Sequence, residues 1–309
     1  MNSIKIIQTG IYLPKEKITN SQLEKNLNLE EGYIQKRTGI ENRYYASQEK
    51  IEDIAYKATK KIFIKDINKE DIGLIITATT STNLLMPGIS NYIQKKLGIE
   101  KCISVDILAG CSGYINALDI ARLYLQNNSI KKALVIGVDV LSKNLKEDDV
   151  ATRVVLSDGA GAILLGKTLN KNKKYESNIT SEIDEKEILT SKTEDKIYMN
   201  GKEIYKYAVT KTIENINDLL KKSDETIENI KYIVPHQSNI KIMNSIANRL
   251  NIDTNKMYIN IQNRGNTFCA SIPIAINDMI KNNLVKKGEK IILLGYGGGL
   301  NTGSILIEI

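Results

Sequence analysis

The feature of this 309-residue sequence that most restricts its fold is an internal repeat. Two segments read as the same unit. One runs from DIGLIITATT through AGCSGY to KKALVIGVDV, and the other from NIKYIVPHQS through NTFCASIP to GEKIILLGYGGG. Corresponding residues are separated by 157 or 158 positions, as in the pairs Thr79 and His236, Cys111 and Cys269, Ile136 and Leu294. A nearly constant offset along both segments indicates duplication of one supersecondary unit.

Each copy alternates short apolar runs, such as ALVIG and IILLG, with longer segments of helical period. Apolar strands that alternate with helices are typical of sheets covered by helices on both faces. The sequence therefore predicts a duplicated α/β fold, with an N-terminal half over 1-167 and a C-terminal half over 168-309. The polar stretch 167-200 is expected to be a long surface connection. A pseudo-twofold relation would bring the strand-to-helix turns of both copies to one cleft.

Cys111 lies in the segment ISVDILAGCSGYINALDIARLYL, where an apolar strand should turn into a helix, with Gly110 before it and Gly113 shortly after it. The first N–H groups of a helix are unpaired and carry partial positive charge, so they favour a thiolate. Glycines let the backbone turn sharply and let a substrate approach. The single histidine of the chain is His236, in YIVPHQSN, so any partnership of cysteine with imidazole must use it.

The composition is that of a soluble globular protein, with 42% hydrophobic and 26% charged residues. No apolar run has the length of a membrane helix, and the N-terminus lacks the apolar core of a signal peptide, so we expect a cytoplasmic protein without a membrane partner. Three cysteines without paired spacing predict free thiols, and the absence of a Cys/His cluster predicts no metal site. The net charge of +7 suits an acidic protein or an anionic small molecule; without tryptophan or a dense basic block, no nucleic-acid partner is expected.

Four motifs in order, AGCSGY, VPHQSN, GNTFCASIP and GYGGG, with YIQKRTGIENRY before them and LSDGAGA between them, make the chain resemble the β-ketoacyl-acyl carrier protein synthases III of the thiolase superfamily. The resemblance implies a thiolase-like five-layered αβαβα fold, a homodimer, and a decarboxylating Claisen condensation that initiates fatty acid biosynthesis. In that family a cysteine takes the acyl group of an acyl-CoA primer, and a carbanion from malonyl-acyl carrier protein then attacks it. The coenzyme A thioester is a substrate, and no cofactor is implied.

By motif match, the resemblance assigns Cys111 as the nucleophile, while His236 and Asn266 act on the malonyl thioester. Imidazole and carboxamide can both donate hydrogen bonds to the thioester oxygen, where negative charge accumulates as CO2 leaves. That role needs a neutral imidazole protonated at Nε2, so we expect a buried histidine with a lowered pKa. The backbone N–H groups of Cys111 and Gly298 are the expected oxyanion hole for acyl transfer.

The resemblance also implies contacts to the substrates. The expected coenzyme A and pantetheine contacts are Tyr33, Arg37, Asn239 and Gly201, the residue that closes the acyl pocket across the dimer is Met86, and the carrier-protein docking residues are Lys241 and Arg249. A second arginine that grips the nucleotide in the family falls at Val150, so this contact is lost, and Arg153 is the nearby alternative. The departure leaves room for a different primer.

Other interpretations stay open. Cys111 could be inert packing, His236 a satisfied core residue, and Asn266 a turn residue. Cys269 occupies the duplicate position of Cys111, where the family carries a small residue, and packing is the favoured interpretation. The alternative functions are a family relative in a specialised pathway with another primer or an acyltransferase outcome, a cysteine hydrolase, and a catalytically idle paralogue that only binds carrier protein.

Overall fold

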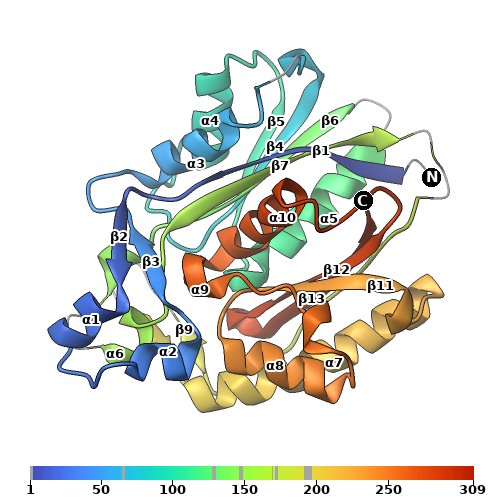
Figure 1. The fold of residues 1–309 in the computed structure, drawn as a ribbon. Helices are drawn as coiled ribbons and strands as arrows, with labels where there is room; N and C mark the ends of the chain where they lie inside the picture. The colour runs from blue at the N-terminus through green and yellow to red at the C-terminus, as the bar shows by residue number, and fades with distance from the viewer. Residues whose placement is uncertain are drawn as a thin grey trace.

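The computed structural model describes residues 3–64, 67–126, 130–145, 149–168, 170, 173–190 and 197–309. Two sheets form its framework (Figure 1). The first is ordered β1 (Ser3–Tyr12), β7 (Gly159–Thr168), β6 (Lys132–Asp139), β4 (Ile72–Ala78) and β5 (Ile103–Ile107). The second is ordered β11 (Ile230–Pro235), β12 (Lys290–Gly297), β13 (Asn301–Glu308) and β8 (Tyr175–Ser181). Two small antiparallel pairs join β2 (Glu16–Thr19) to β3 (Asn42–Tyr45) and β9 (Leu189–Thr190) to β10 (Tyr198–Met199).

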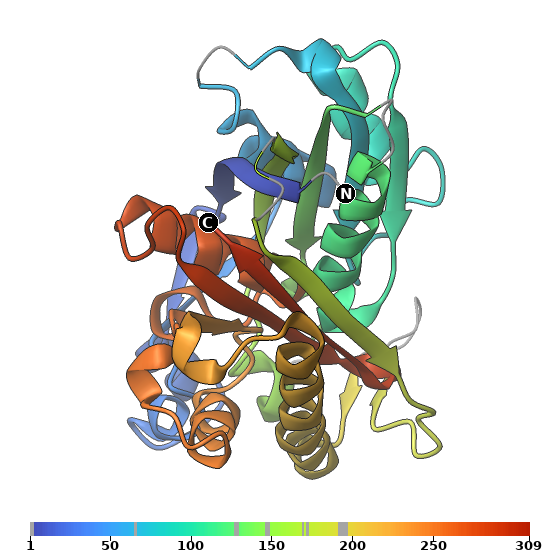
Figure 2. The same cartoon turned by 90° about the vertical axis from the view of Figure 1, so that its right-hand side faces the viewer.

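The sheets and helices form five layers (Figures 1 and 2). The outer face of the first sheet is covered by α3 (Ile51–Lys60) and α4 (Ile89–Leu97). Between the sheets lie α5 (Gly113–Gln126) and α10 (Ser271–Lys281), and the outer face of the second sheet is covered by α7 (Gly201–Ser223) and α8 (Ile240–Arg249). The shorter helices are α1 (Asn20–Asn26), α2 (Tyr33–Thr38), α6 (Val150–Arg153) and α9 (Ile261–Arg264). The predicted five-layered α/β fold is confirmed.

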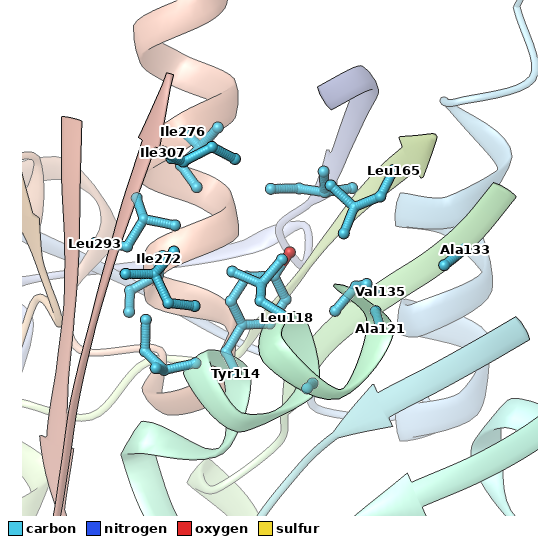
Figure 3. Packing of buried hydrophobic residues seen from close by; sticks show 14 of the residues in the cluster. Tyr114, Leu118, Ala121, Ala133, Val135, Leu165, Ile272, Ile276, Leu293 and Ile307 are labelled. Atoms are coloured by element: carbon cyan, nitrogen blue, oxygen red, sulfur yellow. The ribbon is translucent and has the colours of Figure 1, made fainter. Parts of the chain in front are cut away.

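Alternation along the strands produces these layers. In β12, Leu293 faces the central helices, while Ile292 and Leu294 face the outer helices. The two central helices bury most of their residues because sheets cover them from both directions. Tyr114 of α5 and Ile272 of α10 meet between the sheets, each at most 1% exposed (Figure 3). This core fixes the amino ends of α5 and α10, which carry the turns of the candidate site.

The internal repeat predicted from the sequence is present in the topology. β4 and β6 are parallel while β6 and β7 are antiparallel, and β11, β12 and β13 repeat this arrangement. Ile136 in β6 and Leu294 in β12 occupy matching places, as their spacing predicts. The counterpart of β5 is a single parallel bridge between Ile233 and Met257. The second half therefore keeps the order of the first but shortens its edge.

The polar stretch 167-200 is not the surface connection that we expected. Its residues Tyr175–Ser181 form the edge strand β8, which pairs antiparallel with β13. Tyr175 and Ile179 pack against the central core, while Asn178 donates a hydrogen bond to a backbone carbonyl of α7. One face of this strand lies on a polar helix surface, so the strand carries few apolar residues. Its sequence therefore lacks the apolar pattern that would identify a strand. Residues 169, 171, 172 and 191–196 of this stretch lie outside the described residues.

Two expectations concern the chain as a whole. The chain passes from the first sheet to the second between Thr168 and Tyr175. The halves 1-167 and 168-309 remain our proposal for the domain boundary.

In the part of the chain that the structure describes, no helix combines the length and apolar character needed to cross a bilayer. The same residues hold no group of three or more His, Cys, Asp or Glu side chains arranged for a metal ion.

Candidate active site

Cys111 sits in a tight turn between β5 and α5. The chain passes through a 3₁₀ turn, Gly110–Ser112, into the helix. Gly110 adopts φ +59°, a left-handed conformation that favours glycine, and a Cβ there would lie 2.8 Å from the carbonyl oxygen of Gly298. Gly113 is helical, with φ −53°, and the nearest atoms to a Cβ would be at 3.5 Å. The turn therefore requires the first of these glycines but not the second.

The glycine-rich loop after β12 closes over the thiol. A Cβ at Gly297 would lie 2.9 Å from Cβ and 3.2 Å from Sγ of Cys111, so this approach requires glycine. The backbone N–H groups of Cys111 and Gly298 both interact with the sulfur and lower the pKa of the thiol. Two amides directed at one point are the arrangement that an oxyanion hole needs.

The pKa of Cys111 contradicts the expectation of a helix-activated thiolate. Burial raises the pKa of this thiol, the charge of Asp139 raises it further, and the two backbone N–H groups offset these effects only in part. The side chain is 5% exposed, so a thiolate would lose most of its hydration there. The field of a helix N-terminus, worth at most about 2 kcal/mol at a partly buried site, is too weak to compensate. The resting side chain is therefore a thiol.

His236 follows β11 directly and is held from three sides. Its N–H donates to the carbonyl oxygen of Leu294 at 2.7 Å, and its ring meets the rings of Phe268 and Tyr296 edge to face. Its Nδ1 lies 2.7 Å from the hydroxyl oxygen of Ser271 at the start of α10. Burial lowers the pKa of His236 to about 3, so the imidazole is neutral, as the sequence predicts. When the hydroxyl donates to Nδ1, the ring proton is on Nε2.

Asn266 lies in the turn between α9 and α10. Its backbone is tied to the loop before β7 by two hydrogen bonds of 2.9 Å, from its N–H to Val155 and from the N–H of Ser157 to its carbonyl oxygen. Its side-chain Oδ1 accepts a hydrogen bond from the N–H of Phe268 at 3.0 Å. That bond orients the carboxamide and leaves its Nδ2 as the group that can donate to a ligand.

Two cavities are bordered by Cys111. A small cavity of about 50 Å³ is bordered by Cys111, His236 and Asn266 together. A larger open cavity of about 340 Å³ is bordered by Cys111, Leu108 and Leu141. A larger surface hollow of about 740 Å³, at the starts of β11 and β12, is broad and borders none of these residues. The predicted convergence of the first-half cysteine with the second-half histidine and asparagine is thus a feature of the fold.

Sequence reasoning missed Asp139 and Ser271. Asp139 ends β6 and is fully buried; its Oδ1 accepts hydrogen bonds from the loop after β4, and its Oδ2 accepts the N–H of Cys269 at 2.9 Å. It therefore joins the turn before α10 to the first half of the chain. The repeat contains a signal for Ser271, because it stands 158 residues after Gly113 and so opens the second central helix as the glycine opens the first.

Comparison with known proteins identifies the family. The family model "3-Oxoacyl-[acyl-carrier-protein (ACP)] synthase III" matches residues 105–182, and the model of its C-terminal part matches residues 220–309. A curated β-ketoacyl-[acyl-carrier-protein] synthase III of Clostridium acetobutylicum is 37% identical over 100% of this chain and 99% of the relative. The chain belongs to the 3-oxoacyl-[acyl-carrier-protein] synthase III family.

Solved structures of synthase III proteins share the complete fold. The crystal structure from Aquifex aeolicus superposes with a TM-score of 0.96 at 36% identity, covering 99% of this chain and 100% of the other. The structure from Thermus thermophilus gives a TM-score of 0.93 at 28% identity, covering 98% of each chain. The likeness therefore extends over both halves and is not limited to the motifs.

The residues that the synthase III resemblance assigns to coenzyme A lie partly together. The guanidinium of Arg37 stacks 4.4 Å from the ring centre of Tyr33, one turn earlier on α2. Asn239 donates to the carbonyl oxygen of Arg37 at 3.4 Å and caps α8 by accepting from the N–H of Lys241. Gly201 opens α7, and a Cβ at this position would meet no atom within 4 Å, so its backbone is accessible.

The other positions assigned by resemblance are at the surface or in the core. Met86 is 88% exposed and borders neither cavity of its own chain. Lys241 and Arg249 are exposed at opposite ends of α8. Val150 opens α6 and packs against the core around the second sheet, and Arg153 ends the same helix.

All three cysteines are free, as the sequence predicts. Cys269 is fully buried, and its Sγ lies 3.2 Å from the carbonyl oxygen of Gly110, to which it donates. Burial raises the pKa of this thiol well above its ordinary value. These contacts support the packing interpretation of Cys269.

Proposed function

We propose that the chain condenses an acyl-CoA primer with malonyl-acyl carrier protein through an acyl-cysteine intermediate, and that this reaction initiates fatty acid biosynthesis. Membership in the synthase III family supports the reaction class. The single observation that carries the assignment of residues is that Cys111, His236 and Asn266 border one small cavity. A hydrolase would need a base that acts on the thiol, whereas this imidazole is bonded through Nδ1 to Ser271.

In the first half-reaction, the sulfur of Cys111 attacks the thioester carbonyl of the primer. The N–H groups of Cys111 and Gly298 stabilise the resulting oxyanion. The coenzyme A thiolate then leaves, and the proton of the cysteine thiol ends on it. Because burial raises the pKa of Cys111, the proton departs as the carbon–sulfur bond forms and not in a preceding ionisation.

In the second half-reaction, CO2 leaves the malonyl thioester and its electron pair passes to the α-carbon and thioester oxygen. Nε2–H of His236 and Nδ2–H of Asn266 donate hydrogen bonds to that oxygen. A histidine with a pKa of about 3 remains neutral throughout and acts as a hydrogen-bond donor. The carbanion attacks the acyl carbonyl, the Cys111 thiolate leaves, and 3-oxoacyl-carrier protein is released. The Cys111 thiolate then takes up one proton from solvent, which restores the resting thiol. The other bond changes need only the thiol and the two thioesters, so we propose no cofactor.

The test separates the two half-reactions. H236A and N266A should both take an acyl group from a panel of acyl-CoAs on Cys111, seen as a mass increase, but fail to release CO2 from malonyl-carrier protein. C111A should do neither. N255A, which changes an exposed asparagine in the 3₁₀ turn Thr254–Lys256, is the matched control and should behave as the unmodified chain. Condensation at a normal rate by H236A or N266A would refute the assigned roles, and no adduct from any primer would favour the binding-only paralogue.

A homodimer is part of the proposal, and the free edge of the first sheet supports it. β5 is the edge strand, and its Ile103 and Val105 are 40% and 37% exposed. Leu85, Met86 and Leu108 add further exposed apolar surface near the same edge. An uncovered apolar edge strand favours pairing with a second copy across a twofold axis. Met86 would then reach the open cavity of the partner.

Substrate recognition departs from the family pattern at one position, Val150, where an arginine is absent. We propose that the Tyr33–Arg37 stack supplies the platform for adenine, because aromatic and guanidinium faces both stack on bases. Lys241 and Arg249 are proposed to dock the acidic carrier protein. A specialised-pathway relative with another primer is the alternative that Val150 favours. Cytoplasmic localisation without nucleic-acid or membrane partners remains a prediction from the sequence.

A further inference from the structure

Phe268 has a backbone conformation that is unusual for an aromatic residue. Its φ is +48°, in the left-handed region that glycine tolerates and bulky side chains rarely adopt. Phe268 stands 158 residues after Gly110, which is the offset that relates the two copies. Gly110 has the matching φ of +59°. The second copy therefore keeps a phenylalanine in a turn where the first copy uses glycine, and the ring must offset that strain.

Phe268 borders both cavities at Cys111, the open one and the small one, as do Cys111, Leu189 and Ile197. The centre of its ring is 6.2 Å from that of the His236 ring, in an edge-to-face contact. Its backbone N–H orients the Asn266 carboxamide, a contact that does not involve the side chain. Replacing the side chain thus changes the lining of both cavities without removing the hydrogen bond at Asn266.

We propose that Phe268 is the specificity-determining residue for the primer. Its ring confines the acyl group on Cys111 to the open cavity and keeps it away from His236 and Asn266. This inference rests on the proposed function, because it concerns the acyl group that Cys111 would carry. Primers with a branch or a ring near the thioester would need the space that Phe268 fills, whereas an acetyl group would not. A single methylene in an apolar pocket can alter kcat/KM by roughly 10–200-fold, so an entire ring is a strong filter.

The experiment compares kcat/KM for acylation of Cys111 by acetyl-CoA, 3-methylbutanoyl-CoA and phenylacetyl-CoA. In F268A, the ratio of phenylacetyl-CoA to acetyl-CoA should rise at least tenfold, because the benzyl group of the primer fills the space left by the side chain. F268L, which keeps most of the bulk, should stay near the original ratio. F63A is the matched control, since Phe63 is the other phenylalanine of the chain and lies beside Lys69, away from Cys111.

F268G separates the ring from the backbone strain. Glycine removes both the ring and the strain, so an equal rise of the phenylacetyl-CoA to acetyl-CoA ratio in F268A and F268G supports the proposed role of the ring. If F268A does not fold, the ratio in F268G alone decides whether the ring acts as a filter. Ratios within threefold of the original in both variants would overturn the inference, as would an equal loss for all primers or a comparable rise in F63A. Acylation of the unmodified chain distinguishes failure of the proposed function from failure of the proposal for Phe268. If no primer acylates the unmodified chain, the proposed function is wrong, whatever the variants of Phe268 do.

Discussion

Adding one methyl group at Gly297 should slow the acylation of Cys111 strongly while leaving the fold in place. The Cβ of G297A would lie 2.9 Å from Cβ, 3.1 Å from the backbone nitrogen and 3.2 Å from Sγ of Cys111. The first distance is shorter than real Cβ contacts, and the atoms concerned belong to the turn itself and not to a flexible chain end. The nucleophile must therefore shift away from its position.

The expected size of the effect comes from two sources. Overpacking a close contact costs about 1–3 kcal/mol, which corresponds to a rate decrease of roughly 5- to 160-fold if the cost falls on the transition state. A shift of Cys111 also moves its N–H, one of the two proposed oxyanion donors. Loss of one such donor costs about 2.7–4 kcal/mol, or roughly 100- to 900-fold. We therefore expect acylation to slow by two orders of magnitude or more.

The assay is the rate at which acetyl-CoA adds mass to Cys111, with thermal unfolding measured in parallel. G113A is the matched control, because the nearest atoms to its Cβ, at the start of α5, would lie at 3.5 Å, which is an ordinary contact distance. Alanine is favoured over glycine within a helix by roughly 0.5–1 kcal/mol, so G113A should be at least as stable as the original chain and should acylate normally. Acylation of G297A within threefold of the original rate, or equal damage in G113A, would refute the geometry of the turn.

Two further predictions concern protonation and assembly. The pKa of His236 is about 3 in the fold and 6.5 ordinarily, so the unfolded chain binds more protons between these values and stability is lost as the pH falls through this window. Between pH 7.5 and pH 5, His236 should lower the free energy of unfolding by about 2 kcal/mol relative to H236Q. Urea titration of both proteins at the two pH values measures this difference. Equal pH dependence of the two proteins would contradict the prediction. V105K, on the free edge of β5, should convert the proposed dimer into a monomer in light scattering, whereas I183K, at a side chain that is 85% exposed near α7, should not. A dimer that survives V105K would exclude this edge as the interface.

The fold was predictable because its main signal is redundant. Two copies repeat the same strand and helix pattern, and a constant offset relates Cys111 to Cys269 and Ile136 to Leu294. Buried parallel strands also have continuous apolar runs, which are easy to recognise. The convergence of the catalytic candidates followed from topology and family motifs together. Topology placed the turns that carry residues 111, 236 and 266 at one cleft, and the motifs indicated which of their side chains take part in the reaction.

The errors arose where burial decides the result. The thiolate expectation for Cys111 counted the helix field and could not count desolvation, which depends on how the GYGGG loop closes over the sulfur. β8 was missed because its core-facing side carries only Tyr175 and Ile179 as apolar residues, with Ser177 between them, so its alternation is weak. Asp139 acts through a contact between the halves, with Cys269, and Ser271 through a contact within the second half, with His236. Contacts between residues far apart in the sequence leave no local pattern.

The sealed thiol of Cys269 has a consequence for covalent inhibitors. The duplication gives the chain two cysteines at equivalent positions, each just ahead of a central helix. One borders two cavities, and the other is closed off by the carbonyl group of Gly110. An electrophile therefore needs no chemical preference for one of these two sulfurs, because only the sulfur of Cys111 is accessible from a cavity. A warhead could be chosen for its shape, with its intrinsic reactivity kept low.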